Sequence, residues 1–389
     1  MTRTWLSVAA ALGLLGVAAC NAPPESRESR APAAQPAPKT EQAVREIDVP
    51  DPAKPAETAA IPPATSEAGQ AINAATFASD TAATAEAAPA PTPAKASVSR
   101  LELMVRAQVL LDRAHFSPGV IDGREGSNMR KAISAYEAAH GLPVDGELDE
   151  AVWAQLTAGD ARPALTDYVI TQDDVTGPFL PVVPTDFKAM AKLDKLSYSS
   201  PRERLAEMFH MDETLLSALN PGVDFTQPGV TITVAAPAPA ELSAPVAKIE
   251  VDKALRQVRA YGADGKLLAA YPATVGSSER PAPDGTWAVA GVTLDPNYVY
   301  DPSRLTFGER KAGKLTIPPG PNNPVGSVWI ALTKETYGIH GAPDPKLVGK
   351  TASHGCVRLT NWDARQLAKA TRKGVSVVFV GSEAAPARA

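Results

Sequence analysis

The sequence has few of the residues on which thiol and metal chemistry depend, with two cysteines and five histidines among 389 residues. It also has no surplus of positive charge, because 38 Lys and Arg stand against 43 Asp and Glu, giving a net charge of -5. Binding to a phosphate backbone needs clustered Lys and Arg, and no basic stripe is present, so nucleic acid is not expected as a partner. The Cys and His spacing is not that of a zinc finger or ribbon.

The apolar run at the N-terminus, from Leu6 to Ala19, is too short to span a bilayer comfortably. It follows Arg3 and ends in Val17-Ala18-Ala19-Cys20, the arrangement of a targeting segment in residues 1–20. Small residues before a cysteine resemble a bacterial lipobox, in which Cys20 is lipidated and becomes the mature N-terminus. Ordinary secretion with Cys20 removed or spare is the alternative. Both place the chain outside the cytoplasm and leave Cys356 without an intramolecular disulfide partner.

One stretch near the C-terminus gathers one of the two cysteines and two of the five histidines. Ile339-His340-Gly341 is followed by Thr351-Ala352-Ser353-His354-Gly355-Cys356. Thiol-based acyl transfer needs such a thiol with an imidazole partner, because the thiolate is the nucleophile. A free cysteine of pKa ~8.5 is only about 3% ionised near neutrality, so an imidazole that ionised it fully would raise the thiolate fraction roughly 30-fold. The stretch therefore predicts a catalytic cysteine.

Three other interpretations of Cys356 compete with catalysis. It could be a small buried apolar residue. It could bind zinc together with His340 and His354, although no fourth cysteine or histidine lies nearby in the sequence. It could form a disulfide with Cys20, but the N-terminal targeting segment already accounts for Cys20, by lipidation or by removal. We favour the nucleophile, with no metal and no cofactor.

Two further segments belong with this stretch, Pro318-Pro319-Gly320-Pro321-Asn322-Asn323-Pro324-Val325-Gly326 and Pro283-Asp284-Gly285-Thr286-Trp287. Together with His340-Gly341 and Ser353-His354-Gly355-Cys356-Val357-Arg358-Leu359, they resemble the signature of the L,D-transpeptidase catalytic (YkuD) domain. The resemblance covers about Val246 to Val380. It implies an enzyme whose partners are peptidoglycan stem peptides and glycan.

The same resemblance implies the mechanism. Cys356 attacks the carbonyl of the third-position diamino acid of a stem peptide and expels the terminal D-alanine. A side-chain amine of a neighbouring stem then resolves the acyl-enzyme as a crosslink. His340 is the candidate base and later acid, and His354 is assigned to positioning and electrostatics. His354 stays a plausible thiol partner as well, because it lies two residues from Cys356 and shares its face in an extended segment.

Five other residues complete the predicted site. Ser353 orients an imidazole or closes a turn through its hydroxyl. Gly355 allows close approach of substrate and, with the nucleophile, presents backbone N–H groups to the oxyanion. Arg358 clamps a substrate carboxylate or pairs with a structural acid. Tyr337 lines the donor site or packs in the core, and Gly341 is assigned to substrate binding.

The acceptor stays open at this point. Water in place of the amine would make the chain an L,D-carboxypeptidase or an endopeptidase that cleaves crosslinks. A wall-binding lipoprotein with an inactive catalytic domain is a third possibility. Asn21, rather than Asp, follows Cys20. By resemblance to the usual sorting pattern of bacterial lipoproteins, this implies the periplasmic face of the outer membrane in a diderm host, or release into the periplasm if Cys20 is not lipidated.

The sequence predicts a multi-domain chain. Residues 21–97 are dominated by Ala, Pro, Glu, Thr and Ser and are expected to form a disordered tether, with transient helix at most near Ile72 and Phe77. Residues 98–160 have helical periodicity, including a helix from Ser127 to His140 stopped by Gly141, and resemble a three-helix peptidoglycan-binding domain. There Tyr136 and Trp153 are expected in the core, and His115 and His140 at the surface or in caps.

Residues 165–236 predict a small α+β module. Strands are expected at Tyr168-Val169-Ile170 and Val230–Val234, with a helix from Glu213 to Leu219 and another capped by Ser200, with Pro201 at its first position and Glu203 completing a capping box. The order resembles a degenerate LysM module, and a plain spacer is the alternative.

Residues 246–381 predict a mainly-β catalytic domain, an L,D-transpeptidase-like sandwich or barrel with one packed helix. The helix is expected to be capped by Asn361, to run to about Lys373 and to end at Gly374. The expected strands are Lys248–Asp252, Gln257–Tyr261, Leu267–Val275, Thr286–Leu294, Ser327–Thr333 and Val375–Val380.

Overall fold

The computed structural model describes residues 61–77, 93–239, 241–277, 281–303, 313–351, 353 and 355–382. Residues 1–60, including the predicted targeting segment and Cys20, lie outside the described residues, and so does His354. Within the described ranges, no helix is both long enough and apolar enough to cross a membrane.

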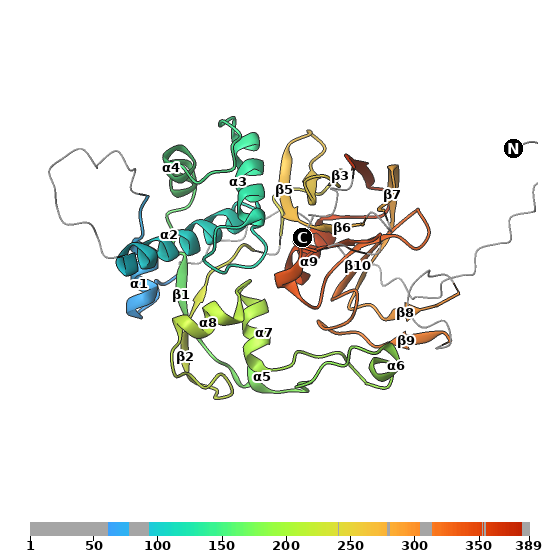
Figure 1. Cartoon of the computed structure of the whole chain (residues 1–389), viewed down its shortest axis with the longest axis horizontal. Coiled ribbons are helices and arrows are strands. Elements are labelled where there is room, and N and C mark those ends of the chain that lie inside the picture. Colours follow the sequence, from blue (N-terminus) through green and yellow to red (C-terminus); the bar gives the residue numbers. More distant parts are fainter. Residues whose placement is uncertain are drawn as a thin grey trace, which may run out of the picture. The chain divides into compact units, whose positions relative to one another are not determined.

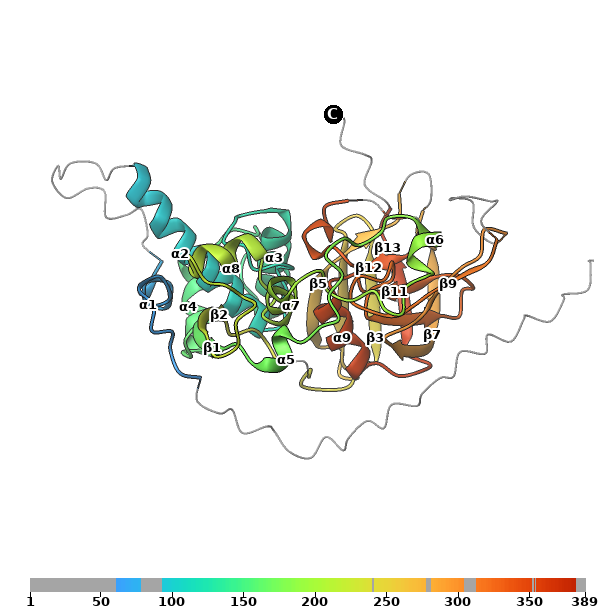
Figure 2. The ribbon, with the colours of Figure 1, turned by 90° about the horizontal axis from the view of Figure 1, so that it is seen from below.

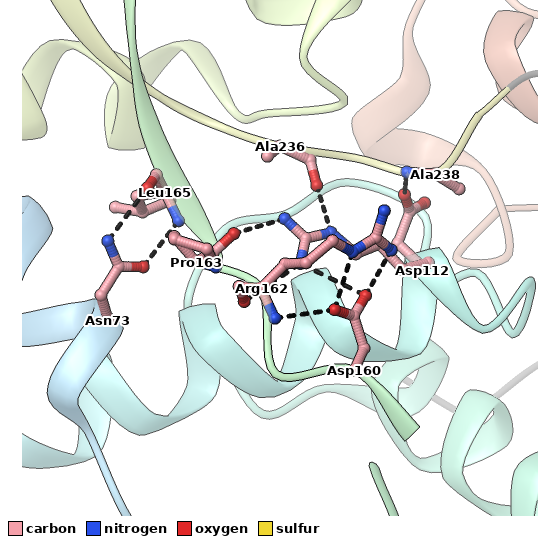
Figure 3. Close-up of polar contacts among 9 residues, drawn as sticks. Asn73, Asp112, Asp160, Arg162, Pro163, Leu165, Ala236 and Ala238 are labelled. Atoms are coloured by element: carbon pink, nitrogen blue, oxygen red, sulfur yellow. Dashed lines mark hydrogen bonds and ion pairs between the residues drawn. The ribbon is translucent and has the colours of Figure 1, made fainter. Parts of the chain in front are cut away.

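The prediction of a disordered tether is wrong for its central part, where helix α1 (Glu67–Ala74) forms. Ser66 caps this helix by accepting from the Gly69 N–H at 3.1 Å, and Ile72 is 2% exposed. The Asn73 side chain bonds both backbone groups of Leu165, donating to its carbonyl at 2.9 Å and accepting from its N–H at 2.8 Å (Figure 3). Local composition did not predict a stable α1, because the helix is held by Leu165, which lies 92 residues further along the chain.

The helical domain has three helices, which Figure 1 shows grouped together: α2 (Pro93–Arg113), α3 (Ser127–His140) and α4 (Glu150–Gly159). The predicted bounds of α3 are confirmed, and Gly141 ends it in the left-handed region at φ 71°. Tyr136 and Trp153 lie in the core, as predicted. The His140 imidazole bonds the Tyr136 carbonyl at 2.8 Å and stacks on its ring, and His115 adopts a φ of 65°.

The α+β module pairs two antiparallel strands, β1 (Leu165–Val169) and β2 (Thr231–Ala235), with Tyr168 opposite Ile232. Its longer helices cover a core that includes Leu205 and Leu216. The helices of the module are α5 (Gln172–Val175), α6 (Phe187–Met190), α7 (Pro201–Met208) and α8 (Glu213–Leu219). The expected order of strand, helices and strand is therefore present, and the predicted bounds of α8 are confirmed.

The capping box predicted for α7 is only half present. Ser200 accepts from the Glu203 N–H at 3.2 Å, and Pro201 stands at the first position, as expected. The Glu203 carboxylate, however, accepts from the Ser199 N–H at 2.5 Å and from the Asn322 amide at 2.9 Å. The glutamate is drawn away from the cap because a tertiary partner competes for it.

The catalytic domain is mainly β, as predicted, and is built on a nine-stranded sheet of order β5-β4-β3-β13-β7-β10-β11-β12-β6. Only Ala273 separates β5 from β6, so the two ends of the sheet must approach one another and the sheet folds over on itself. The strands are β3 (Lys248–Asp252), β4 (Gln257–Tyr261), β5 (Leu267–Pro272), β6 (Thr274–Val275), β7 (Gly285–Leu294), β10 (Val328–Leu332), β11 (Gly338–His340), β12 (Val357–Arg358) and β13 (Ser376–Val380).

One helix, α9 (Asn361–Ala370), packs against β10 and β11 of this sheet. Figure 2 shows α9 in front of the strands of the sheet. Its N-cap is Thr360, whose hydroxyl accepts from the Asp363 N–H at 3.1 Å, so the prediction of Asn361 as the cap is wrong. The helix also ends at Ala370 rather than reaching Gly374. Because Thr360 satisfies the helix start, the Asn361 amide is available for other partners.

The C-terminal end of α2 joins several connecting segments through the Arg113 guanidinium, which donates to the carbonyls of Ala236 at 2.6 Å and Pro163 at 2.5 Å. Next to it, Asp112 accepts from the Ala238 N–H at 2.8 Å, as Figure 3 shows. Five donors in a planar fork let one arginine satisfy several carbonyls at once. This end of α2 therefore fixes the chain both before and after the α+β module.

Candidate active site

The predicted catalytic residues lie on two neighbouring parallel strands. In the register of β11 and β12, Ile339 pairs with Val357 and His340 with Arg358, and Cys356 directly precedes β12. Paired residues share a face of a sheet, and residues two apart on a strand point the same way. His340, Arg358 and Cys356 are therefore placed on one face.

His340 is buried, at 3% exposure, and its ring stacks on Trp329 at 5.4 Å. Its Nδ1 lies 2.6 Å from the Gly341 carbonyl oxygen. A carbonyl can only accept, so Nδ1 carries the proton of the neutral ring and Nε2 holds the lone pair. Burial, helped by the charge of Arg358, lowers the pKa of His340 to about 3. The imidazole is thus neutral and able to act as a base.

Cys356 is partly exposed, and burial of the sulfur raises the pKa of its thiol, with the Gly338 backbone and the Arg358 charge opposing that shift. Within the described part of the chain, the thiol donates to the Thr336 carbonyl at 3.7 Å. Thr336 has a φ of 71°, which is unusual for a β-branched residue. Such backbone strain is concentrated at functional sites.

The two pKa shifts oppose a preformed thiolate–imidazolium pair, which the sequence had led us to expect. Burial penalises the charged form of the Cys356 thiol and of the His340 ring alike. Both shifts therefore favour the neutral forms of the thiol and of the imidazole.

Ser353 closes the turn that presents the nucleophile. Its hydroxyl donates to the Cys356 carbonyl at 2.6 Å and accepts from the Gly355 N–H at 3.2 Å. The turn interpretation of Ser353 therefore describes the structure. The Gly355 N–H, predicted as an oxyanion donor, donates to the Ser353 hydroxyl in this turn, and its role toward an oxyanion stays a prediction. Gly355 has a φ of 108°, which only glycine adopts readily.

Comparison with known protein families identifies the domain that contains this site. Residues 247–380 match the family model described as "L,D-transpeptidase catalytic domain", and residues 100–156 match the "Putative peptidoglycan binding domain". The chain contains an L,D-transpeptidase catalytic domain. Both matches lie where the sequence motifs predicted them.

The chain is also similar to individual proteins. The chain is 28% identical over 175 residues to "Putative L,D-transpeptidase YkuD" of Bacillus licheniformis, a match that covers 45% of this chain and 90% of the relative. It is 29% identical to "Probable L,D-transpeptidase ErfK/SrfK" of Salmonella typhimurium, covering 43% of this chain and 56% of that one. A crystal structure of L,D-transpeptidase 3 from Mycobacterium tuberculosis aligns with a TM-score of 0.30 at 15% identity, covering 40% of this chain and 75% of that one.

Arg358 of the transpeptidase domain lies beside the nucleophile. Burial lowers its pKa, while the negative forms of Cys356 and Tyr298 favour its charged state. Among the residues that the structure describes, Arg358 forms no ion pair with a carboxylate. A substrate carboxylate is a suitable partner for this guanidinium.

Tyr337 and Gly341 take up different positions around the site. A Cβ on Gly355 would lie 3.0 Å from Tyr337 Cε1, so the tyrosine ring stands against the turn of the nucleophile, with Lys334 5.4 Å from its centre. A Cβ on Gly341 would lie 2.1 Å from Asn361 Oδ1. Gly341 therefore leaves room for an amide, a packing role that its assignment to substrate binding did not include.

Tyr298 is a residue of the site that sequence reasoning missed. It lies on β8 (Tyr298–Tyr300), which pairs with β9 (Leu315–Ile317). Burial, and then the charge of Cys356, raises the pKa of Tyr298 to about 12, so the phenol and the thiol interact electrostatically. The alternating Tyr-Val-Tyr of a three-residue strand was too short a signal to predict this position.

The zinc interpretation of the site gains no support from the described residues, among which no group of three or more His, Cys, Asp and Glu could hold a metal ion. His354, the third member of that hypothetical set, lies outside them. His340, Cys356, Arg358, Tyr337 and Tyr298 are the residues that the structure brings together.

Proposed function

We propose that the chain is a cysteine-dependent L,D-transpeptidase that crosslinks peptidoglycan stem peptides. The observation that supports this most directly is the bond from His340 Nδ1 to Gly341 O at 2.6 Å, which leaves Nε2 as a base on the face that carries Cys356. A neutral base beside a neutral thiol suits attack on an amide carbonyl.

In the proposed reaction, the Cys356 sulfur bonds to the carbonyl carbon of the third stem residue while His340 takes the thiol proton. The carbon–nitrogen bond to the terminal D-alanine then breaks, and His340 returns the proton to the leaving amine. An amine of a second stem attacks the thioester, forming the crosslink and restoring the thiol. The Cys356 N–H and Arg358 are the candidates for stabilising the oxyanion and the substrate carboxylate.

Product analysis separates this function from its hydrolytic alternatives. Purified protein is incubated with disaccharide-tetrapeptides, and the products are identified by mass spectrometry. Transpeptidation predicts crosslinked dimers with release of D-alanine, whereas water as the acceptor gives tripeptides alone. Cys356→Ala serves as the matched control and should give neither. Turnover by Cys356→Ala near the wild-type rate would exclude the mechanism.

We further propose that the helical domain holds the enzyme on the wall and that Cys20 anchors it by lipid at the periplasmic face of the outer membrane. The match of residues 100–156 to a peptidoglycan-binding family supports wall binding. A fatty-acid probe should label the wild type but not Cys20→Ser, and the variant should leave the membrane fraction. A wild type that stays unlabelled would refute the anchor.

A further inference from the structure

One of the contacts between the α+β module and the transpeptidase domain is made by Glu207, a carboxylate of α7. Glu207 accepts from the Asn361 amide nitrogen at 3.0 Å and 3.2 Å, one bond to each carboxylate oxygen. The Tyr198 hydroxyl donates to the same carboxylate at 3.2 Å. Both donors point at Glu207, so this carboxylate fixes the orientation of the Asn361 amide.

The segment just before α7 holds the loop 318–326, one of the two additional motif segments. The Leu196 N–H donates to the Pro319 carbonyl at 2.9 Å, and the Leu196 carbonyl accepts from the Asn322 N–H at 3.1 Å. A Cβ on Gly320 would lie 2.1 Å from the Leu196 oxygen, so only glycine allows this approach. Glu203 adds its bond to the Asn322 amide at 2.9 Å.

The Asn361 side chain is held between this loop and β11. Its Oδ1 accepts from the Ser327 N–H at 2.9 Å, and its nitrogen donates to the Pro321 carbonyl at 3.2 Å. A Cβ on Gly326 or on Gly341 would lie 2.1 Å from Asn361 Oδ1 in either case. The amide thus fills the space that both glycines leave open.

Both backbone segments that meet the Asn361 amide also contact the catalytic imidazole. The Gly341 carbonyl accepts from His340 Nδ1 at 2.6 Å, and the Val325 backbone lies close enough to favour the protonated ring. A shift of the amide would therefore move the groups that set the tautomer and orientation of His340.

We propose that Glu207 is a positioning residue for His340, acting through Asn361 and the loop 318–326. The α+β module is then part of the scaffold of the active site rather than a spacer. This inference rests on the proposed transpeptidase function. Burial raises the pKa of Glu207 to about 7, opposed by its bonds to Asn361 and Tyr198, with Glu203 and Arg365 as its charged neighbours.

The test compares three variants in the full chain. Glu207→Ala removes the acceptor, whereas Glu207→Gln keeps one oxygen for Asn361 and Tyr198. Glu213→Ala, on α8 of the same module, removes a carboxylate that pairs with Arg202 at the surface and is the matched control. Acylation by a disaccharide-tetrapeptide gives kcat and KM, and thermal melting reports folding.

We expect Glu207→Ala to lower kcat by about 10- to 100-fold with KM unchanged, the size of effect that a small misplacement of a catalytic group produces. Glu207→Gln should recover most of this loss, and Glu213→Ala should behave as the wild type. A folded Glu207→Ala protein with wild-type kcat, or a loss confined to KM, would overturn the proposal.

A second measurement is independent of turnover. The imidazole signals of His340, assigned by their absence in His340→Gln, are titrated by NMR. Loosening of the loop should admit water and raise the pKa of His340 in Glu207→Ala above that in the wild type, while Glu213→Ala leaves it in place. An identical His340 titration in Glu207→Ala and wild type contradicts the inference. Failure of the wild type to be acylated would count against the proposed transpeptidase function. The His340 titration would still test whether Glu207 positions His340.

Discussion

Two residues of α9, Asn361 and Asp363, join the transpeptidase domain to different neighbours. Asn361 bonds Glu207 of the α+β module at 3.0 Å and lies against the backbone beside the catalytic histidine. Asp363 accepts from the Ser117 hydroxyl of the helical domain at 3.0 Å. The two contacts have similar lengths, but the first adjoins His340, the proposed base. Proximity in the sequence therefore says little about which junction affects catalysis.

The Asp363 junction surrounds a cavity of about 110 Å³ that is also lined by Asp112, His210 and Trp362. Asp112 interacts with His210 Nδ1 at 3.2 Å, and the His210 ring stacks on Trp362 at 4.9 Å. Burial, together with the charge of Asp112, raises the pKa of Asp363 to about 7. This junction links domains through buried titratable groups, so its effects should appear in stability.

Replacing His340, the proposed base, sets the upper limit for any effect on kcat that is transmitted through Asn361. His340→Ala should lower kcat by about 10²- to 10⁴-fold, the usual range for loss of a general acid–base group. The pH dependence of Cys356 alkylation should stay unchanged, because a neutral imidazole does not stabilise the thiolate. Alkylation rates measured across pH test this point. An upward shift of the midpoint in the variant would show that a thiolate–imidazolium pair exists after all.

The comparison is tested most sharply by changing each of the two α9 residues. Asn361→Ala removes the bonds to Glu207 and Ser327, so kcat should fall by about 10- to 100-fold. Asp363→Asn keeps an acceptor for Ser117 and should leave kcat within about twofold of the wild type, since a neutral–neutral bond replaces it at small cost. Steady-state kinetics of both variants provide the measurement. Equal losses of kcat in Asn361→Ala and Asp363→Asn would show that the two contacts do not differ in their effect on catalysis.

Stability should depend on pH through Asp363. Its folded-state pKa is raised to about 7, whereas an unfolded aspartate titrates near ~3.9. The folded state therefore binds more protons between these values, and the free energy of unfolding falls as pH rises through that window, by up to about 1.4 kcal/mol per pH unit. Asp363→Asn should remove this slope. Urea denaturation at pH 5 and pH 8 checks it, and an identical slope in the variant would rule out this group as the source.

A single hydrogen bond between the helical domain and the transpeptidase domain should have the smallest effect. The Asn128 amide donates to the Val348 carbonyl at 2.9 Å. Asn128→Ala should cost about 1 kcal/mol of stability, the net value of one such bond, with kcat unchanged. Thermal melting and kinetics together provide the measurement. A drop in kcat without a drop in stability would mean that the helical junction also reaches the active site.

Local signals predicted the elements whose ends are set by nearby residues. The bounds of Ser127–His140 follow from Gly141 at its C-terminus, and those of Glu213–Leu219 from the Asn220-Pro221-Gly222 stop. The motif around His340 and Cys356 was also recognisable in the sequence, because it is short, and the roles of the two residues as base and nucleophile stay predictions. The ends of these helices and the motif itself are set by residues that lie near one another in the sequence.

The sequence did not predict the hydrogen bonds of residues that have more than one possible partner. Thr360 and Asn361 are both residue types that cap helices well. Thr360 is the N-cap here because the Asn361 side chain is hydrogen-bonded to Glu207, which lies 154 residues away in the sequence. The Glu203 carboxylate left its expected cap for Asn322, 119 residues away. Tyr298 lies on a strand of three residues, which is too short for its alternating pattern to be recognised in the sequence. Such choices depend on tertiary contacts that no local pattern contains.

Acylation of Cys356 is the step on which all the kinetic predictions depend. The most direct measurement mixes the wild type with a disaccharide-tetrapeptide in the absence of an acceptor, stops the reaction with acid and maps the peptides by tandem mass spectrometry. The predicted result is a disaccharide-tripeptide adduct on Cys356 as a thioester, released by hydroxylamine and absent from Cys356→Ala. Release of D-alanine by the wild type with no adduct on Cys356, or by Cys356→Ala at a comparable rate, would contradict it.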